Sequence, residues 1–351
     1  MYDLDEILIQ SVKVKASDIH LTTGRPPSYR IDGVLSPIEG ERLTPQMLED
    51  ILMPLMDVRH REELQNNGQT DFAYAISGVG RFRVNVFKQR GTLASVMRSL
   101  PFNIPEPEEL GIPAEVVEMT SRKRGLVLVT GPTGSGKSTT LASLIHVINR
   151  NYPYHIITLE DPIEYLHRHD KSVVNQREIG SDSTSYAQAL RAALREDPDV
   201  ILVGEMRDLE TISTAITAAE TGHLVFSTLH TIGAAPTIER IVDVFPPHQQ
   251  NQIRSQLASV LEAVISQQLL PTIDGKSRVA AFEVMLGTPA IKNLIREDKA
   301  HQIPSIMQTS KKIGMQTMDD SLFSLYLKHK IDAANAVEYA QDTGNMQQKL
   351  F

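Results

Sequence analysis

The residues best placed to do chemistry form a glycine-rich loop at positions 131–138. The loop reads Gly-Pro-Thr-Gly-Ser-Gly-Lys-Ser, with four residues between its outer glycines and a lysine and a hydroxyl residue after the second. An apolar run rich in β-branched residues precedes it at 125–130, and apolar residues at helical spacing follow it. A loop between a buried strand and a helix cradles phosphate on backbone N–H groups. The alternative is a turn of glycine and serine that matches the pattern by chance. The predicted strand before the loop and the predicted helix after it disfavour this alternative.

The positions of this loop have expected parts in nucleotide binding. Lys137 would reach the β- and γ-phosphates, and Ser138 would offer its hydroxyl to Mg²⁺. The glycines permit a tight turn in which successive N–H groups point inward. The residues expected to contact the nucleotide here are Gly131, Pro132, Thr133, Gly134, Ser135, Gly136, Lys137, Ser138 and Thr139.

Two acidic clusters follow predicted strands, where an open α/β sheet presents its ligand. The first ends at Glu164 and also holds Glu160, which we count among the nucleotide contacts. In the second, Gly204 stands where an aspartate is usual, so Glu205 must act alone or through a water. Because hydrolysis needs groups that orient water and manage Mg²⁺, we expect Glu164 and Glu205 to be catalytic. Turn formation or helix capping is the alternative for such acids, and it stays open for Asp161.

Histidines and arginines supply the remaining candidates. We place His223 and His230 on either side of a strand end at 226–228, where a histidine serves as a hydrogen-bonded core residue, a nucleotide sensor or a metal ligand. Metal ligation is disfavoured because no carboxylate or cysteine stands at ligand spacing. Most single arginines are surface charges, so two or three should touch nucleotide, some from a neighbouring subunit. The arginine candidates are Arg81, Arg83, Arg195, Arg207 and Arg240.

Composition narrows the class of protein. With 351 residues, 41% hydrophobic and 22% charged, the chain has the composition of an ordinary soluble protein of two domains. Its net charge of −8 argues against a protein that mainly grips nucleic acid. It has no cysteine, which excludes disulfides and thiolate metal sites. The first residues lack a signal-like apolar core, and no apolar run approaches membrane-spanning length, so we expect a cytoplasmic protein.

The pattern of residue types along the chain predicts four regions. Residues 1–98 form an α+β domain, the four prolines in 99–113 predict a semi-rigid linker, and 114–287 alternate strands with helices as in a parallel sheet with crossovers. Residues 288–351 are predicted to be wholly helical. Within the third region, an apolar stripe from Ile253 to Ile265 predicts one long helix.

These residues resemble the secretion-type ATPases, a family of RecA-like motors, over essentially the whole chain. Residues 17–21 resemble the family's N-domain signature, 131–138 its Walker A, 157–165 its aspartate box, 200–208 its Walker B and 221–230 its histidine box. Within the family, the chain is similar to the retraction ATPases of type IV pili. The assembly ATPases usually carry a longer N-terminal region and a four-cysteine zinc element, for which we expect neither room nor cysteines in these 351 residues, and this favours the retraction branch.

The segment 290–297 resembles the C-terminal signature of the retraction branch, with Lys292 where arginine is usual. In physical terms, it is a helix with Thr288 as N-cap and Pro289 in its first turn. We expect a buried face of Ile291, Leu294 and Ile295 and an exposed face of Lys292, Asn293, Arg296 and Glu297. An amphipathic packing helix is the plain alternative.

The resemblance implies a fold and a division of labour. The fold would be α/β, with an N-terminal PAS-like α+β domain, a RecA-like ATPase domain and a C-terminal helical region. Lys137 and Ser138 would bind phosphate and Mg²⁺, Glu164 would polarise the attacking water, and Glu205 would hold Mg²⁺ through water. The two histidines would link nucleotide state to the surrounding fold.

The resemblance also implies an assembly and a biological role. The family works as a homohexameric ring in which each N-domain packs on the neighbouring ATPase domain. ATP turnover would move an inner-membrane platform protein at the inner face of the cytoplasmic membrane, and pilin subunits would leave the fibre, as in twitching motility. A second retraction ATPase is a further possible partner.

Rival interpretations come from other classes. An accessory retraction ATPase or another type II/IV secretion-family motor would share these motifs. A regulatory scaffold that binds ATP without useful turnover is disfavoured by the pair Glu164 and Glu205. A DNA-directed RecA-like enzyme is disfavoured by the net charge and by the lack of interleaved basic and aromatic residues, so we expect no nucleic-acid partner.

Overall fold

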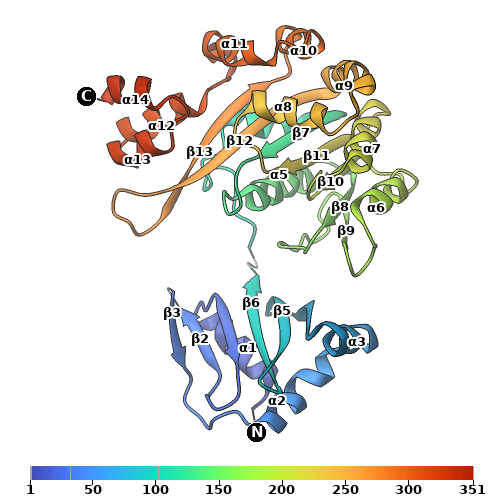
Figure 1. Ribbon diagram of the computed structural model, residues 1–351, viewed down its shortest axis with the longest axis vertical. Coiled ribbons are helices and arrows are strands. Elements are labelled where there is room, and N and C mark those ends of the chain that lie inside the picture. Colours follow the sequence, from blue (N-terminus) through green and yellow to red (C-terminus); the bar gives the residue numbers. More distant parts are fainter. Residues whose placement is uncertain (1, 32, 101–102, 351) are drawn as a thin grey trace. The chain divides into compact units, whose positions relative to one another are not determined.

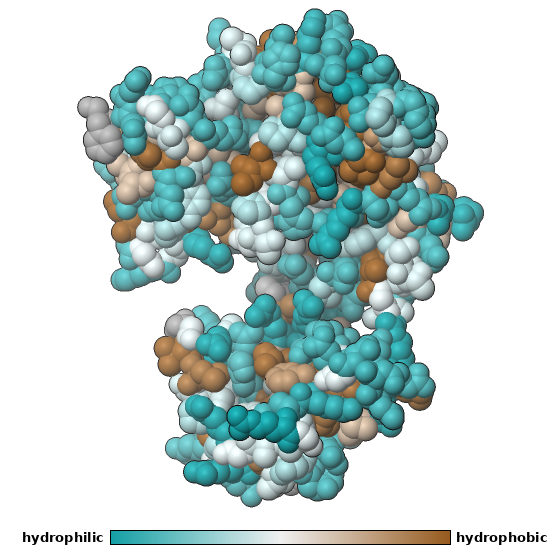
Figure 2. Space-filling view, in the orientation of Figure 1, coloured by the Kyte–Doolittle hydropathy of each residue, from teal (hydrophilic) through white to brown (hydrophobic). Residues whose placement is uncertain are grey.

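The computed structural model describes residues 2–31, 33–100 and 103–350. The chain forms two compact units, which meet in sequence between Asn103 and Ile104. Among the described residues, no helix combines the length and the apolar character needed to cross a membrane. On the face drawn in Figure 2, apolar residues are scattered among a majority of hydrophilic ones.

The first unit is an antiparallel sheet with helices packed on it (Figure 1). Asp3 caps the first helix by accepting hydrogen bonds from the backbone N–H groups of Asp5 and Glu6. The strands lie in the order β3-β2-β1-β6-β5-β4. In chain order the elements are α1 (Leu4–Lys13), β1 (Asp18–Leu21), β2 (Ser28–Ile31), β3 (Val34–Pro37), α2 (Pro45–Leu52), α3 (Val58–Asn67), β4 (Gln69–Ile76), β5 (Gly80–Gln89) and β6 (Thr92–Leu100).

The predicted linker at 99–113 needs correction at both ends. Strand β6 continues through Leu100, because its last residues still pair with β5. Ile104 already belongs to the second unit, and Ile112 is buried in that unit's core. Residues 104–113, with three of the four prolines, therefore belong to the second unit, residues 101–102 lie outside the described residues, and the boundary lies inside the predicted stretch.

The second unit is built on a sheet in the order β13-β12-β7-β11-β10-β8-β9. The strands run parallel to their neighbours except for β13, which is antiparallel to β12. Its elements up to residue 286 are α4 (Ala114–Val117), β7 (Gly125–Thr130), α5 (Lys137–Asn151), β8 (His155–Glu160), β9 (Val173–Glu178), α6 (Tyr186–Ala193), β10 (Val200–Val203), α7 (Leu209–Glu220), β11 (Leu224–Leu229), α8 (Ala234–Asp243), α9 (Pro247–Val260), β12 (Leu261–Pro271) and β13 (Arg278–Leu286).

Strand β7 is buried on both faces, as its apolar sequence predicts. Leu126 and Leu128 face a core that includes residues of α6, α7, α8 and α9. Val127 and Val129 face the opposite core, which α5 and the segment before β7 complete. Helices thus cover both sides of the sheet, and the sheet edge at the strand ends is left for a site.

The long helix predicted through Ile265 is wrong. Helix α9 ends at Val260, and Leu261 begins β12, which pairs with β7 in parallel and with β13 in antiparallel register. Residues 261–268 are almost entirely buried between these neighbours. A short continuous apolar run fits a buried strand as well as a buried helix, so only pairing with β7 decides between them.

Beyond residue 288 the named elements are helical, as predicted: α10 (Pro289–Arg296), α11 (Ile303–Thr309), α12 (Met318–Leu327), α13 (Ala333–Glu338) and α14 (Thr343–Leu350). Figure 1 shows α12, α13 and α14 beside the β12–β13 hairpin, with which they share a small core. Helices α10 and α11 pack elsewhere, because their buried residues belong to the core that α8 and α9 also form.

Helix α10 has the predicted cap, and two of the three residues of its predicted buried face are buried, whereas Leu294 is half-buried. The Thr288 hydroxyl accepts a hydrogen bond from Ile291 N, and Ile291 and Ile295 are fully buried. The expectation that Lys292 is exposed is wrong. Its side chain is largely buried, and its Nζ lies 3.4 Å from Glu262 Oε1.

Candidate functional site

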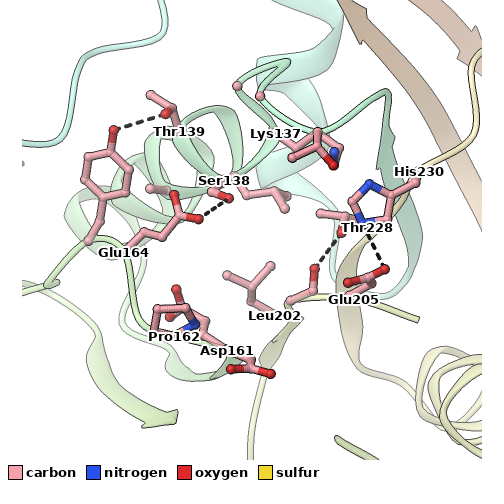
Figure 3. Close-up of a pocket in the computed structure, with 18 of the residues that line it drawn as sticks. Lys137, Ser138, Thr139, Asp161, Pro162, Glu164, Leu202, Glu205, Thr228 and His230 are labelled. Atoms are coloured by element: carbon pink, nitrogen blue, oxygen red, sulfur yellow. Dashed lines mark hydrogen bonds and ion pairs between the residues drawn. The ribbon is translucent and has the colours of Figure 1, made fainter. Parts of the chain in front are cut away.

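Four parallel strand ends meet at one edge of the second sheet. The register pairs Leu159 of β8 with Val203 of β10, Val203 with Ser227 of β11, and Leu229 of β11 with Thr130 of β7. The segments after these strands therefore gather together. They line a cavity of about 540 Å³, with the phosphate loop on one side and the two acidic clusters on another (Figure 3).

The phosphate loop is closed around its own lysine. Lys137 is buried, and its Nζ donates to the carbonyl oxygens of Gly131 at 2.8 Å and Pro132 at 3.0 Å. Burial lowers the pKa of Lys137, and the carboxylates of Glu205 and Glu164 oppose that shift. An ammonium held this way is positioned to turn toward an anion.

The sequence of the loop follows from close packing behind it. Gly131 adopts a positive φ, and a Cβ there would clash with the backbone oxygen of Gln267 in β12. Gly136 also has positive φ and caps α5 at its N-terminus. The Gln267 side chain accepts from Thr140 at 2.8 Å, which joins the first turn of α5 to β12. Strand β12 therefore packs directly behind the phosphate loop and fixes its position against the sheet.

The loop suits a phosphate group. Among the described residues, the buried Oγ of Ser135 has no hydrogen-bond partner. Gly134 faces open space, the helix N-terminus of α5 points at the loop, and Thr133, Gly134, Gly136, Lys137, Ser138 and Thr139 line the cavity. An unpartnered hydroxyl and a buried ammonium around an open turn form the donor set that an anion requires.

Glu164 reaches the loop from the segment after β8. Its Oε1 accepts a hydrogen bond of 3.1 Å from the Ser138 hydroxyl. The hydroxyl oxygens of Tyr165 and Thr139 are 3.0 Å apart, which gives this segment a second contact with the first turn of α5. Figure 3 shows the Glu164 carboxylate pointing toward Ser138.

Glu205 approaches the same cavity from the end of β10. Its Oε1 lies 2.9 Å from His230 Nε2 and 2.5 Å from Arg207 Nε, and its side chain is only 15% exposed. The missing aspartate at 204 has a steric reason. A Cβ on Gly204 would lie 2.8 Å from Tyr186 Oη and 3.0 Å from the backbone oxygen of Leu159.

Glu160 also lines the cavity, but its carboxylate is engaged by the protein. It accepts from Thr158 Oγ1 at 2.6 Å and from Gln176 Nε2 at 3.1 Å. Burial raises the pKa of Glu160 despite these hydrogen bonds. Its contacts tie β8 to β9, the strand at the edge of the sheet.

The chain is similar to known proteins over nearly its whole length. The family described as "Type II/IV secretion system protein" matches residues 1–313. The chain belongs to the type II/IV secretion system protein family. It is 50% identical over 339 residues to the type IV pilus retraction ATPase PilT of Pseudomonas aeruginosa, covering 97% of this chain and 98% of that one. It is 48% identical to a twitching motility protein of Neisseria gonorrhoeae, covering 95% and 91%.

A solved structure agrees with these relatives. The crystal structure of the pilus retraction motor PilT with bound ADP superposes with a TM-score of 0.93 at 53% identity, covering 99% of this chain and 100% of that one. The predicted α/β fold class with its RecA-like core is confirmed. The family resemblance drawn from the motifs, its retraction branch and its ATPase class are confirmed by the same matches.

His223 lies outside the lining of the cavity, and its contact with nucleotide remains a prediction. Strand β11 begins at Leu224, so His223 precedes the strand, and its backbone oxygen accepts from Gly125 N at the start of β7. The imidazole Nδ1 lies 2.9 Å from the oxygen of Ala218. The strand's six residues separate the two histidines by about 20 Å.

The arginine candidates divide into groups. Arg207 lines the cavity, whereas Arg195, whose side chain donates to the Arg191 oxygen at 3.1 Å, and Arg240, in the last turn of α8, lie outside its lining. Arg81 and Arg83 belong to β5 of the first unit, where Arg83 Nε is 3.7 Å from Asp71. A nucleotide contact by these four outlying arginines remains a prediction.

Sequence reasoning missed several residues of the cavity wall. Thr228 Oγ1 donates to the Gly204 oxygen at 2.6 Å and so fixes the turn before Glu205. Its position at the end of a predicted strand was the available signal. Tyr186 opens a helix, and Arg278 opens a strand, so no local pattern marks them. The lining residues that were not predicted as site residues include Tyr165, His167, Tyr186, Thr228, Leu269 and Arg278.

Proposed function

We propose that this chain is the ATP-hydrolysing subunit of a homohexameric motor that retracts type IV pili. The observation that carries the proposal is the convergence of Glu164 and Glu205 on one phosphate loop, because an inert nucleotide-binding scaffold needs neither acid. The biological role is taken from the relatives, which are named as a pilus retraction ATPase, a twitching motility protein and a pilus retraction motor with bound ADP.

The residues of the cavity suggest the following parts. Bound ATP and Mg²⁺ would supply the phosphoryl group and neutralise its charge. Lys137 would exchange the loop carbonyls for the β- and γ-phosphates, and Ser138 would turn its hydroxyl to the metal. Glu205, held by Arg207 and His230, would retain Mg²⁺ through a water. Glu164, released from Ser138, would orient the attacking water.

The assembly is also part of the proposal. In a ring, some of the outlying arginines would reach a neighbouring subunit's nucleotide; the candidates are Arg81, Arg83, Arg195 and Arg240. ATP turnover would move an inner-membrane platform protein, with the ring at the cytoplasmic face of the membrane. A second retraction ATPase would be a further partner.

The proposal is tested with Lys137→Ala in a host that makes type IV pili, with Lys123→Ala, an exposed lysine outside the cavity lining, as the matched control. Surface pilus density, movement and protein level are measured, together with phosphate release by the purified chains. We expect Lys137→Ala to lose phosphate release, pili to accumulate and movement to stop, while the control behaves as the parent does.

Other outcomes separate the rivals. Loss of pili in Lys137→Ala would make the chain an assembly motor. Normal pili and movement despite lost phosphate release would indicate an accessory motor or another secretion machine. Normal phosphate release in Lys137→Ala would overturn the phosphate-loop assignment itself.

A further inference from the structure

Strand β9 grips the backbone of the segment that carries Glu164. This segment, the glutamate loop, comprises residues 161–172 between β8 and β9. Both ends of the side-chain amide of Gln176, in β9, form hydrogen bonds with the backbone of this loop. Nε2 donates to the Tyr165 oxygen at 2.8 Å, and Oε1 accepts from His167 N at 2.8 Å. The two bonds fix the chain immediately after Glu164.

Glu178, two residues further along β9, fixes the chain before Glu164. It is buried, and its Oε2 accepts from Ile163 N at 3.1 Å. Residues two apart on a strand point to the same face, so Gln176 and Glu178 contact the loop from one side. Glu164 therefore lies between two anchored stretches of backbone.

Strand β9 is itself fixed to β8. The parallel register pairs Thr158 with Gln176 and Glu160 with Glu178, and Ile179 N donates to the Glu160 oxygen at 2.8 Å. Gln176 Nε2 also bonds the buried carboxylate of Glu160 at 3.1 Å. Because β9 is bonded to β8, its contacts fix the loop relative to the end of β8, where the loop begins.

The bond between Ser138 and the Glu164 carboxylate cannot hold that carboxylate throughout the reaction. Ser138 is proposed to turn its hydroxyl to Mg²⁺, which breaks its bond to the Glu164 carboxylate. Gln176 and Glu178 lie outside the cavity lining, so their bonds can persist when nucleotide enters. In the nucleotide-bound state the Glu164 carboxylate has therefore lost its own contact with the phosphate loop, while the backbone around it keeps the bonds from β9 and the Tyr165–Thr139 contact.

We propose that Gln176 and Glu178 are positioning residues for hydrolysis. They fix the backbone on both sides of Glu164, so that its carboxylate stays aimed over the phosphate loop after Ser138 has turned away. The inference rests on the proposed catalytic role of Glu164. Positioning of this kind acts on turnover more than on nucleotide binding, because Gln176 and Glu178 lie outside the lining of the nucleotide cavity.

The test uses the full chain with Gln176→Ala, Glu178→Ala and the conservative Glu178→Gln. Glutamine keeps an acceptor for Ile163 N, and its amide can donate to the Ser181 hydroxyl, which now lies 3.4 Å from Glu178 Oε1. Asn175→Ala is the matched control, because Asn175 is exposed on the same strand and contacts His155 at 2.8 Å. The kcat and KM for ATP are measured with the amide hydrogen exchange of residues 161–172.

In the two alanine variants we expect kcat to fall by about ten- to a hundredfold with KM for ATP within about twofold of the parent. Exchange in the glutamate loop should accelerate in both. Glu178→Gln should recover most of the lost kcat, and Asn175→Ala should match the parent. If Glu178→Ala fails to fold, the half-buried Gln176→Ala carries the test.

Three results would overturn the inference. One is unchanged exchange in folded alanine variants, which would mean that the bonds do not hold the loop. Another is faster exchange with kcat within about twofold of the parent, which would make the grip merely structural. The last is a Glu178→Gln as impaired as Glu178→Ala. Normal turnover in Glu164→Ala would instead contradict the catalytic assignment, and the exchange data would still report on the anchoring.

Discussion

Glu205 stands at the end of an interior strand, where Arg207 and His230 contact its carboxylate directly. Glu164 stands in a loop beside the edge strand, where β9 bonds the backbone on either side of it. The carboxylate of Glu164 itself is exposed and bonds the Ser138 hydroxyl. Glu205 is thus held by ion pairs to its carboxylate, whereas Glu164 is held through the backbone on either side of it.

The two modes of support suit the two proposed roles. A carboxylate that retains Mg²⁺ through water can stay in one ion-paired position throughout the cycle. A carboxylate that orients an attacking water must keep its own charge and lone pairs available, so its position is better fixed through the backbone. The predictions below test whether the two sides of the cavity are separable in this way.

The largest effect is expected on the Glu164 side. Glu164→Ala should lower kcat by about 10²- to 10⁴-fold, as loss of a general base does, and leave ATP binding intact. Phosphate release and binding of a fluorescent ATP analogue measure the two properties. Failure to bind nucleotide, with residual chemistry normal in the bound fraction, would show that the role of Glu164 is misassigned.

The next prediction concerns His167, which lies in the glutamate loop and lines the cavity. Burial, with a smaller contribution from His146, lowers the pKa of His167 to about 4. The unfolded chain binds this proton near pH 6.5, so the stability from neutral His167 is complete above that pH and is lost as pH falls toward 4. The loss is at most about 3 kcal/mol.

His167→Gln should remove most of this acid sensitivity. Urea unfolding of the parent and the variant at pH 7 and pH 5 measures it, and the parent should lose more stability between the two pH values. Equal losses in both chains would mean that His167 is not the group responsible.

A smaller effect is expected from the support of Glu205. His230→Gln removes the contact at 2.9 Å from a side chain that is 45% exposed, so we expect a loss of about tenfold at most. It should appear as a higher Mg²⁺ requirement for phosphate release, with hydrogen exchange of residues 161–172 unchanged. If exchange in the glutamate loop rises instead, the two sides of the cavity are not independent.

Local sequence was enough to predict which residues gather at the strand ends. The phosphate loop between a strand and a helix, and Glu164 and Glu205 after neighbouring strands, follow from spacing and from the rule that parallel strands end at one edge. The cap and buried face of α10 follow from Thr288 and from helical periodicity. These features depend on residues near one another in the chain.

Local sequence did not predict the features that depend on residues distant in the chain. Residues 253–265 fit a single helix by periodicity, and only the pairing of β12 with β7 shows that the chain is extended from Leu261. Strand β9 was not predicted, since its sequence Val-Val-Asn-Gln-Arg-Glu carries only a short apolar signal.

The sequence by itself determined that this chain has a nucleotide-binding α/β fold with two acids at the edge of its sheet. Those features are written in contiguous residues whose backbone preferences and spacing suffice. The tertiary structure alone decided how each acid is supported, since His230 contacts the Glu205 carboxylate from beyond β11 and Gln176 of β9 bonds the backbone of the glutamate loop. Such contacts join separate elements, and a side chain's partner across a sheet depends on strand order and register, which no local pattern encodes.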